Sequence, residues 1–255
     1  MPGTLQSIFR YPVKGLSAEP LSTAQLAPGQ PLANDRRFAL AHGSVRFDLS
    51  SPEYLAPSNF LMLKKDEKLA LLTTRFDDES EVLTIERQGR QLARGKITEP
   101  TGRMLVEQFL SGFIGPTGRG VPKLVEAKAT HHFADAPEGF ISLINLASVA
   151  DLTRVTREEV DPKRFRANLW IEGLPAWTER YWVGQRLSVG GQAFDVVEET
   201  PRCAATNVNP ETGERDMNLP RTLVRGYGHE NFGVYLLPRG TGSIACGDPV
   251  ERLDR

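Results

Sequence analysis

The chain has 255 residues, of which 40% are hydrophobic and 25% are charged, a composition typical of a soluble globular protein. Its 31 basic and 32 acidic residues leave a net charge of −1, which argues against nucleic acid or an anionic membrane as a partner. No apolar run approaches the ~20 residues that cross a bilayer, and the N-terminus lacks a signal-peptide pattern. With two cysteines and no export signal, the chain is expected to be cytoplasmic, with reduced thiols.

Short β-type segments dominate the first third of the chain. Turn residues such as Pro28-Gly29 separate them, and the acidic run at residues 77–81 indicates a solvated hairpin tip. The predicted strands are Leu5–Phe9, Arg37–Ala41, Ala70–Thr74 and Val82–Glu86.

A helix is predicted over Gly102–Phe113, where apolar residues recur at helical spacing. Residues 112–122 then contain four glycines and two prolines. This stretch indicates either the boundary between two domains, 1–120 and 121–255, or a long internal loop beside a ligand.

The second half alternates short strands with two helices. Because short strands predominate, we expect a mainly β (α+β) fold of the barrel type with a few helices. The helices are predicted at Ala147–Val155 and Leu219–Tyr227, and the strands at Asn168–Ile171, Arg186–Val189, Phe194–Glu198, Gly233–Leu237 and Ser243–Ala245.

Cys203 is the most informative residue for chemistry. It directly follows Arg202 and precedes a tight-turn signal at residues 209–213, so it is expected at a strand end near a positive charge. A neighbouring cation favours the thiolate, the form that ligates metals or attacks electrophiles. The alternative is an ordinary semi-buried cysteine. Cys246, among apolar residues before a Gly-Asp-Pro turn, is interpreted as a small hydrophobe packed in a strand.

Several common sites are disfavoured by the motifs. The two cysteines and the histidines at positions 42, 131, 132 and 229 show no zinc-ligand spacing, although a Cys–His dyad stays open. The chain has no Walker A loop, no G-x-G-x-x-G after a strand and no C-x₂-C clusters, which argues against a bound nucleotide or an iron–sulfur centre.

Three segments combine cations with turn residues. They contain Lys14, the pair Arg36-Arg37, and Arg166 within residues 161–168. Taken singly, each is more often a solvated charge cluster. Arginine forks suit phosphate oxygens, so the three together would be significant if the fold gathered them.

The ordered set of motifs resembles the MOSC family, named for the C-terminal domain of molybdenum cofactor sulfurase, preceded by that family's N-terminal β-barrel domain. The first two motifs match the N-terminal domain, and the rest match the MOSC domain. The motifs are Tyr11-Pro12-Val13-Lys14-Gly15, Asp35-Arg36-Arg37-Phe38, Phe165-Arg166-Ala167-Asn168, Arg202-Cys203, Asn209-Pro210-Glu211-Thr212-Gly213, Phe232-Gly233-Val234-Tyr235 and Gly247-Asp248-Pro249-Val250.

The resemblance implies a molybdenum cofactor (molybdopterin) with Cys203 as catalytic metal ligand. It assigns the cofactor's phosphate and pterin to Lys14, Arg36, Arg166 and Asn168, with Arg202 flanking, and suggests a further contacting loop at Asn145–Ser148. This chain departs from the family by carrying Asn209 where relatives often have an aspartate, which puts an acid/base role there in doubt.

The resemblance favours an oxidoreductase like the amidoxime-reducing components, acting on small N-hydroxylated substrates. Because the chain ends at Arg255 without a fused ferredoxin domain, electrons are expected from a separate donor protein or reductase. The alternative is a cofactor or sulfur carrier, with a persulfide on Cys203, that works with a pyridoxal-phosphate sulfurase. A third interpretation is a β-rich protein that has lost the activity.

Overall fold

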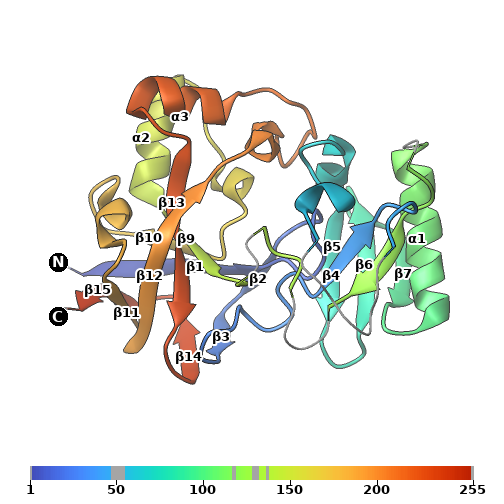
Figure 1. Cartoon of the computed structure of the whole chain (residues 1–255), viewed down its shortest axis with the longest axis horizontal. Helices are drawn as coiled ribbons and strands as arrows, with labels where there is room; N and C mark the ends of the chain where they lie inside the picture. Colours follow the sequence, from blue (N-terminus) through green and yellow to red (C-terminus); the bar gives the residue numbers. More distant parts are fainter. Residues whose placement is uncertain (1, 47–54, 117–118, 128–131, 136–137, 254–255) are drawn as a thin grey trace.

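The computed structural model describes residues 2–46, 55–116, 119–127, 132–135 and 138–253, and it has two lobes (Figure 1). One lobe is a closed β-barrel, and the other is a smaller β-structure covered by a helix. The fold is mainly β, as predicted.

Seven strands close the barrel, in the order β10-β9-β13-β12-β11-β15-β1 and back to β10. Only β9 and β10 pair in parallel, and closure leaves none of the seven strands as a free edge. The strands are β1 (Gly3–Arg10), β9 (Ile141–Asn145), β10 (Leu169–Glu172), β11 (Arg186–Val189), β12 (Gln192–Pro201), β13 (Asn231–Pro238) and β15 (Pro249–Leu253).

Apolar side chains from all seven strands fill the barrel. Leu5, Leu143 and Phe194 are each fully buried there. Burial of one such side chain contributes roughly 1.5–3 kcal/mol, so the interior is the main source of the barrel's stability.

Two helices cover one end of the barrel, at the top of Figure 1: α2 (Leu146–Thr156) and α3 (Leu219–Tyr227). They enclose a separate apolar cluster in which Phe165 stacks on Phe232 with ring centroids 4.0 Å apart. This cluster underlies the loops that follow β10 and β12.

The second lobe contains the antiparallel sheet β5-β6-β7 and the pair β4–β8. Helix α1 packs on β7, at the right of Figure 1. The bounds are β4 (Phe38–Ala41), β5 (Thr73–Asp77), β6 (Val82–Arg87), β7 (Arg90–Lys96), α1 (Pro100–Ile114) and β8 (Lys123–Glu126).

Helix α1 lies unusually close to β7 because residue 102 is glycine. A Cβ atom on Gly102 would lie 2.1 Å from the carbonyl oxygen of Lys96. Pro100, at the start of the helix, fixes φ where no helical hydrogen bond is lost.

The two lobes are interlaced along the chain. Strand β1 lies in the barrel, β2 (Glu19–Leu21) pairs with β1, and β3 (Thr23–Leu26) pairs with β14 (Gly242–Ala245). The predicted boundary between 1–120 and 121–255 stays a prediction, but residues 3–26 lie with the second half of the chain.

Short 3-10 turns complete the fold. They are η1 (Pro57–Asn59), η2 (Glu67–Leu71), η3 (Pro162–Phe165), η4 (Thr178–Trp182) and η5 (Ala204–Asn207). No described helix combines the length and apolar character that would let it cross a membrane.

One predicted strand is misplaced. Of the segment Ala70–Thr74, the first two residues end the turn η2, and only Thr73 and Thr74 belong to the strand β5, which continues to Asp77. Leu69 and Leu72 are both buried, and their spacing of three residues suits a helical turn rather than a strand. The other predicted strands and all three predicted helices overlap observed elements, and the acidic run joins β5 to β6 as predicted.

Candidate functional site

Tyr11 organises the cations that the sequence singled out. It directly follows β1, and its ring is 1% exposed. The guanidinium carbon of Arg36 lies 4.7 Å from the ring centroid, and that of Arg166 lies 4.4 Å from it. The tyrosine hydroxyl donates to the carbonyl oxygen of Ala167 (3.3 Å), so both arginines stack on a fixed ring.

The backbone around Arg36 and Arg166 is held in an uncommon conformation. Both residues have φ of 51°, in the left-handed region that side chains other than Asn and Gly rarely adopt. The Arg36 amide donates to the Tyr11 carbonyl (2.7 Å), and the Tyr11 amide donates to Asp35 (2.7 Å). Such strain persists only where the surroundings impose it, and it is common at functional sites.

The two arginines differ in their partners. Arg36 contacts the Asp35 carboxylate and donates to the Arg166 carbonyl (3.0 Å). Burial alone would lower the pKa of Arg36, but Asp35 raises it. The guanidinium of Arg166 has no hydrogen-bond acceptor among the described residues, and burial, followed by the nearby Arg36, lowers its pKa to about 10. Arg166 therefore forms no ion pair among the described residues, although the carboxylates of Asp135 and Asp35 act on it from a distance.

Lys14 points toward the same region. It is 7% exposed, and its Nζ donates to the Phe133 carbonyl (2.9 Å) and to Asp135 (2.5 Å). Burial lowers the pKa of Lys14, with Arg36 adding to the effect and Asp135 opposing it. Asp135 is mostly exposed, so its carboxylate can give way to another anion.

Arg202 joins the end of β12 to the start of β13. Its guanidinium donates to the Phe232 carbonyl (2.6 and 2.8 Å) and to the Phe165 carbonyl (2.7 Å). Because these acceptors are neutral, the charge of Arg202 is not cancelled by an acid, and burial lowers its pKa to about 10. Tyr235, Cys203, Asp135 and Tyr11 each lie near enough to oppose this lowering of the Arg202 pKa.

Cys203 lies at the surface immediately after this arginine. Its side chain is exposed, and its backbone carbonyl accepts the Thr206 hydroxyl (2.9 Å) at the start of η5. Arg164 holds the far end of the turn through the Asn207 carbonyl (3.2 Å) and Asp216 (2.7 Å). The interpretation of Cys203 as a semi-buried structural cysteine is wrong, because its thiol faces solvent beside a buried cation.

Asn209 stabilises this loop in a way that an aspartate could not. Its amide nitrogen donates to Asp216 (2.7 Å), and its carbonyl oxygen accepts from the Glu211 amide (2.9 Å). An aspartate at position 209 would place two carboxylates at hydrogen-bond distance. Asn209, which stands where relatives often have an aspartate, is therefore the residue that suits the neighbouring Asp216 carboxylate.

The structure does not place Asn168 with the cations. Asn168 is 1% exposed, and its side chain bonds the Ser142 hydroxyl (3.0 Å) and the Phe9 carbonyl (3.1 Å). Its polar atoms hold β1, β9 and β10 together, so its assignment to cofactor binding lacks geometric support.

The polar side chains of the loop Asn145–Ser148 are likewise engaged in hydrogen bonds with other parts of the protein. Asn145 caps α2 by accepting the Ala147 amide (3.0 Å). Ser148 donates to Glu179 (2.8 Å), and both side chains are fully buried. The suggested cofactor contact through this loop is therefore not supported.

Cys246 is a further correction. It lies just after β14, its side chain is exposed, and its Sγ lies 3.5 Å from the Leu21 carbonyl oxygen. The interpretation as a hydrophobe packed in a strand is wrong, because Cys246 lies in the turn between β14 and β15.

The described residues contain no group of three His, Cys, Asp or Glu side chains that could hold a metal ion. His131 lies outside the described residues.

The fold thus gathers Lys14, Arg36, Arg166 and Arg202, hereafter the cation cluster, with Cys203 at its edge. Tyr11, Asp135 and Tyr235 also belong to the site, since each interacts electrostatically with the cluster. Tyr11 and Tyr235 lie within motifs that the sequence singled out, whereas no pattern marks Asp135.

Two family models match the chain. That of the MOSC N-terminal beta barrel domain matches residues 2–113, and that of the MOSC domain matches residues 128–251. The chain belongs to the MOSC family. The MOSC domain model covers Arg166, Arg202 and Cys203, and the N-terminal model covers Lys14 and Arg36, so the site lies between the two parts.

Named relatives fall into two groups. The MOSC protein is 27% identical to the molybdenum cofactor sulfurase of Caenorhabditis elegans over 91% of this chain and 33% of the relative. It therefore spans about a third of that enzyme's length. It is 24% identical to the mitochondrial amidoxime reducing component 2 of Macaca fascicularis over 98% of this chain and 84% of the relative.

A solved structure, the YUAD protein from Bacillus subtilis, aligns over 98% of the MOSC protein and 94% of its own chain. It has a TM-score of 0.45 and 11% identity, too distant a likeness to bear on function.

Proposed function

We propose that this MOSC protein holds a molybdenum cofactor, with the thiolate of Cys203 as the protein ligand to the metal. We further propose that it reduces small N-hydroxylated substrates with electrons from a separate protein. The observation that carries the proposal is Arg166, whose stacked guanidinium has no acceptor among the described residues. The exposed thiol of Cys203 is linked to it through Arg202, which donates to the carbonyl of Phe165, the residue before Arg166.

The residues present fit a phosphorylated, sulfur-ligated group. Lys14, Arg36 and Arg166 would hold the terminal phosphate, because a dianion would offset the unpaired charge of Arg166 and could replace the exposed Asp135 at Lys14. Cys203 would supply a soft sulfur ligand, the kind that molybdenum already has in its dithiolene. When bound, the cofactor supplies two-electron redox chemistry.

The remaining residues position these groups. Tyr11 fixes the two arginine planes, and Arg202 holds the β12 end from which Cys203 projects. In the overall reaction, the N–O bond of an N-hydroxylated base breaks with the uptake of two electrons and two protons, and the products are the base and water. Support for this reaction comes from the relatives named amidoxime reducing components.

The test is metal analysis of the full chain produced with molybdate. We expect molybdenum in the wild type, loss of most of it in Cys203→Ser, and full retention in Cys246→Ser, where the other exposed thiol is the matched control. The metal-loaded wild type should then reduce benzamidoxime anaerobically with an artificial electron donor.

Equal molybdenum in Cys203→Ser and the wild type would disprove the ligand assignment. Metal-loaded protein that turns over no N-hydroxylated substrate would disprove the reductase activity.

A second candidate rests on the sulfurase relatives, whose alignment covers most of this chain. In that case, Cys203 would carry a persulfide for a pyridoxal-phosphate sulfurase. Intact-mass analysis of the native protein separates the two: one additional sulfur atom on Cys203, without molybdenum, favours the carrier.

A further inference from the structure

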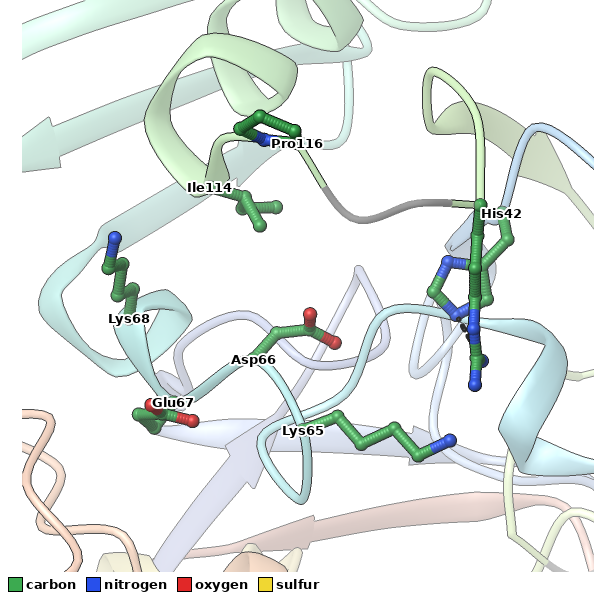
Figure 2. Close-up of a pocket in the computed structure, with 8 residues that line it drawn as sticks. His42, Lys65, Asp66, Glu67, Lys68, Ile114 and Pro116 are labelled. Carbon is green, nitrogen blue, oxygen red and sulfur yellow. Dashed lines mark hydrogen bonds between the residues drawn. The ribbon is translucent and has the colours of Figure 1, made fainter.

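A cavity of about 380 Å³ lies in the second lobe, where α1 ends beside η2 and the residue after β4 (Figure 2). None of its lining residues belongs to the cation cluster or to the Cys203 loop. Figure 2 shows Ile114 and Pro116 on one wall, Lys65 and Asp66 on the facing wall, and His42 at one end. The lining residues are His42, Lys65, Asp66, Glu67, Lys68, Ile114, Pro116 and Arg119.

The charges of this cavity favour an anion. Both acids are already engaged, since Asp66 accepts the Met62 amide (3.0 Å) and Glu67 pairs with Arg215 (3.0 Å). Lys65 and Lys68, in contrast, form no ion pair or side-chain hydrogen bond within the described ranges. The lysine charges are therefore available to a ligand.

His42 adds an unsatisfied donor. It is 4% exposed, its Nε2 lies 3.3 Å from an Arg119 nitrogen, and its buried Nδ1 has no partner in the described part of the chain. Because arginine can only donate, Nε2 accepts, and Nδ1 of the neutral ring must carry the hydrogen. A buried donor without an acceptor is costly and uncommon, and a turn of the ring toward the cavity would let Nδ1 donate to an anion there.

We propose that this cavity binds a small organic anion, with its carboxylate or phosphate held by Lys65 near His42, and its apolar body against Ile114 and Pro116. The volume lies within the range of small-molecule sites, roughly 300–1,000 Å³. This site does not depend on the proposed cofactor, because its residues are distinct from the cation cluster.

The test is an NMR titration of the full chain with benzoate and with phenyl phosphate, following the His42 ring resonances. We expect saturable shifts with at least one of the two anions and none with benzamide, which lacks the charge. Lys65→Ala should weaken binding about three- to fivefold, the effect of removing one partly exposed charge.

The matched control is Lys64→Ala. Lys64 is the exposed neighbour that does not line the cavity, and its loss should leave the dissociation constant unchanged. Anion binding at the cation cluster would be insensitive to Lys65, so this pair of variants assigns the site. Both lysines are exposed, and equal melting temperatures would verify that both variants fold.

Three results would overturn the proposal. One is the absence of saturable shifts at His42 with either anion. Another is an equal increase of the dissociation constant in Lys64→Ala and Lys65→Ala, which would mean that the anion responds only to the charge of the surface. The third is binding of inorganic phosphate as tight as that of phenyl phosphate, which would leave no role for the apolar wall.

Discussion

Glu179 shows how a single buried acid can make stability depend on pH. Its side chain is fully buried beneath α2, one oxygen accepts the Ser148 hydroxyl (2.8 Å), and the other has no partner among the described residues. Burial raises the pKa of Glu179 above its ordinary value, although Ser148 opposes the shift. The folded protein therefore favours the protonated acid.

We expect Glu179→Gln to remove part of the pH dependence of folding. The raised pKa stabilises the fold fully below the ordinary pKa of the acid, and this contribution is lost as pH rises through the folded-state value. Glutamine does not titrate. The difference in melting temperature, variant minus wild type, should therefore increase from pH 5 to pH 8. If melting temperature plotted against pH gave parallel lines for the two proteins over this range, the prediction would be contradicted.

The candidate site could be predicted from sequence only where a residue carries its own motif. Cys203 follows a cation in the chain, and Lys14 lies beside a glycine after a strand, so the sequence singles out both. Tyr11 was missed as a stacking platform, because its two arginines come from distant parts of the chain. Asn168 was assigned to the cofactor because its motif does not reveal that β1 and β9 use its amide.

At the scale of elements, α1 offers a comparison between two glycines. Gly102 leaves no room for a Cβ atom against β7, whereas a Cβ on Gly112 would meet nothing within 4 Å. Their sequence neighbourhoods do not distinguish them, but their packing does.

Gly102→Ala should destabilise the fold by about 3 kcal/mol, since the new methyl group must displace backbone rather than a flexible side chain. Gly112→Ala should be neutral or stabilising by about 0.5 kcal/mol, because alanine lowers the entropy cost of the helix. Urea unfolding of both variants provides the measurement. Equal effects would show that α1 does not pack on β7 this closely.

Helices and strands were predictable from the sequence where polar and apolar residues alternate with a regular period. Helix α3 was predicted with its observed bounds, Leu219–Tyr227, because polar and apolar residues alternate at helical spacing. Strand β9 was missed because all five of its residues are buried, which leaves no alternation to detect. Strand β7 was missed for the opposite reason, since no residue in it is fully buried.

At the scale of the whole molecule, β1 connects the two halves of the chain. It pairs with β10 through Thr4–Glu172 and with β15 through Gly3–Val250, so it closes the barrel. The sequence predicted a barrel but not this closure, because pairing between distant strands leaves no local signal.

A chain truncated to residues 121–255 should therefore lack a cooperative thermal transition. Without β1, both β10 and β15 have free edges, and the core loses Leu5 and Ile8, each worth roughly 1.5–3 kcal/mol. Adding a peptide of residues 2–26 should restore the transition, while the same peptide with Leu5→Asp should not. A cooperative, monomeric 121–255 fragment on its own would disprove the role of β1.

The placement of β1 also bears on synthesis. On the ribosome, β1 emerges before every strand it pairs with, and its last partner, β15, ends at Leu253. Until the second half of the chain is made, β1 can pair only with β2, while the smaller lobe is translated and can already fold. We expect this interval to be the period when the newborn chain depends most on chaperones.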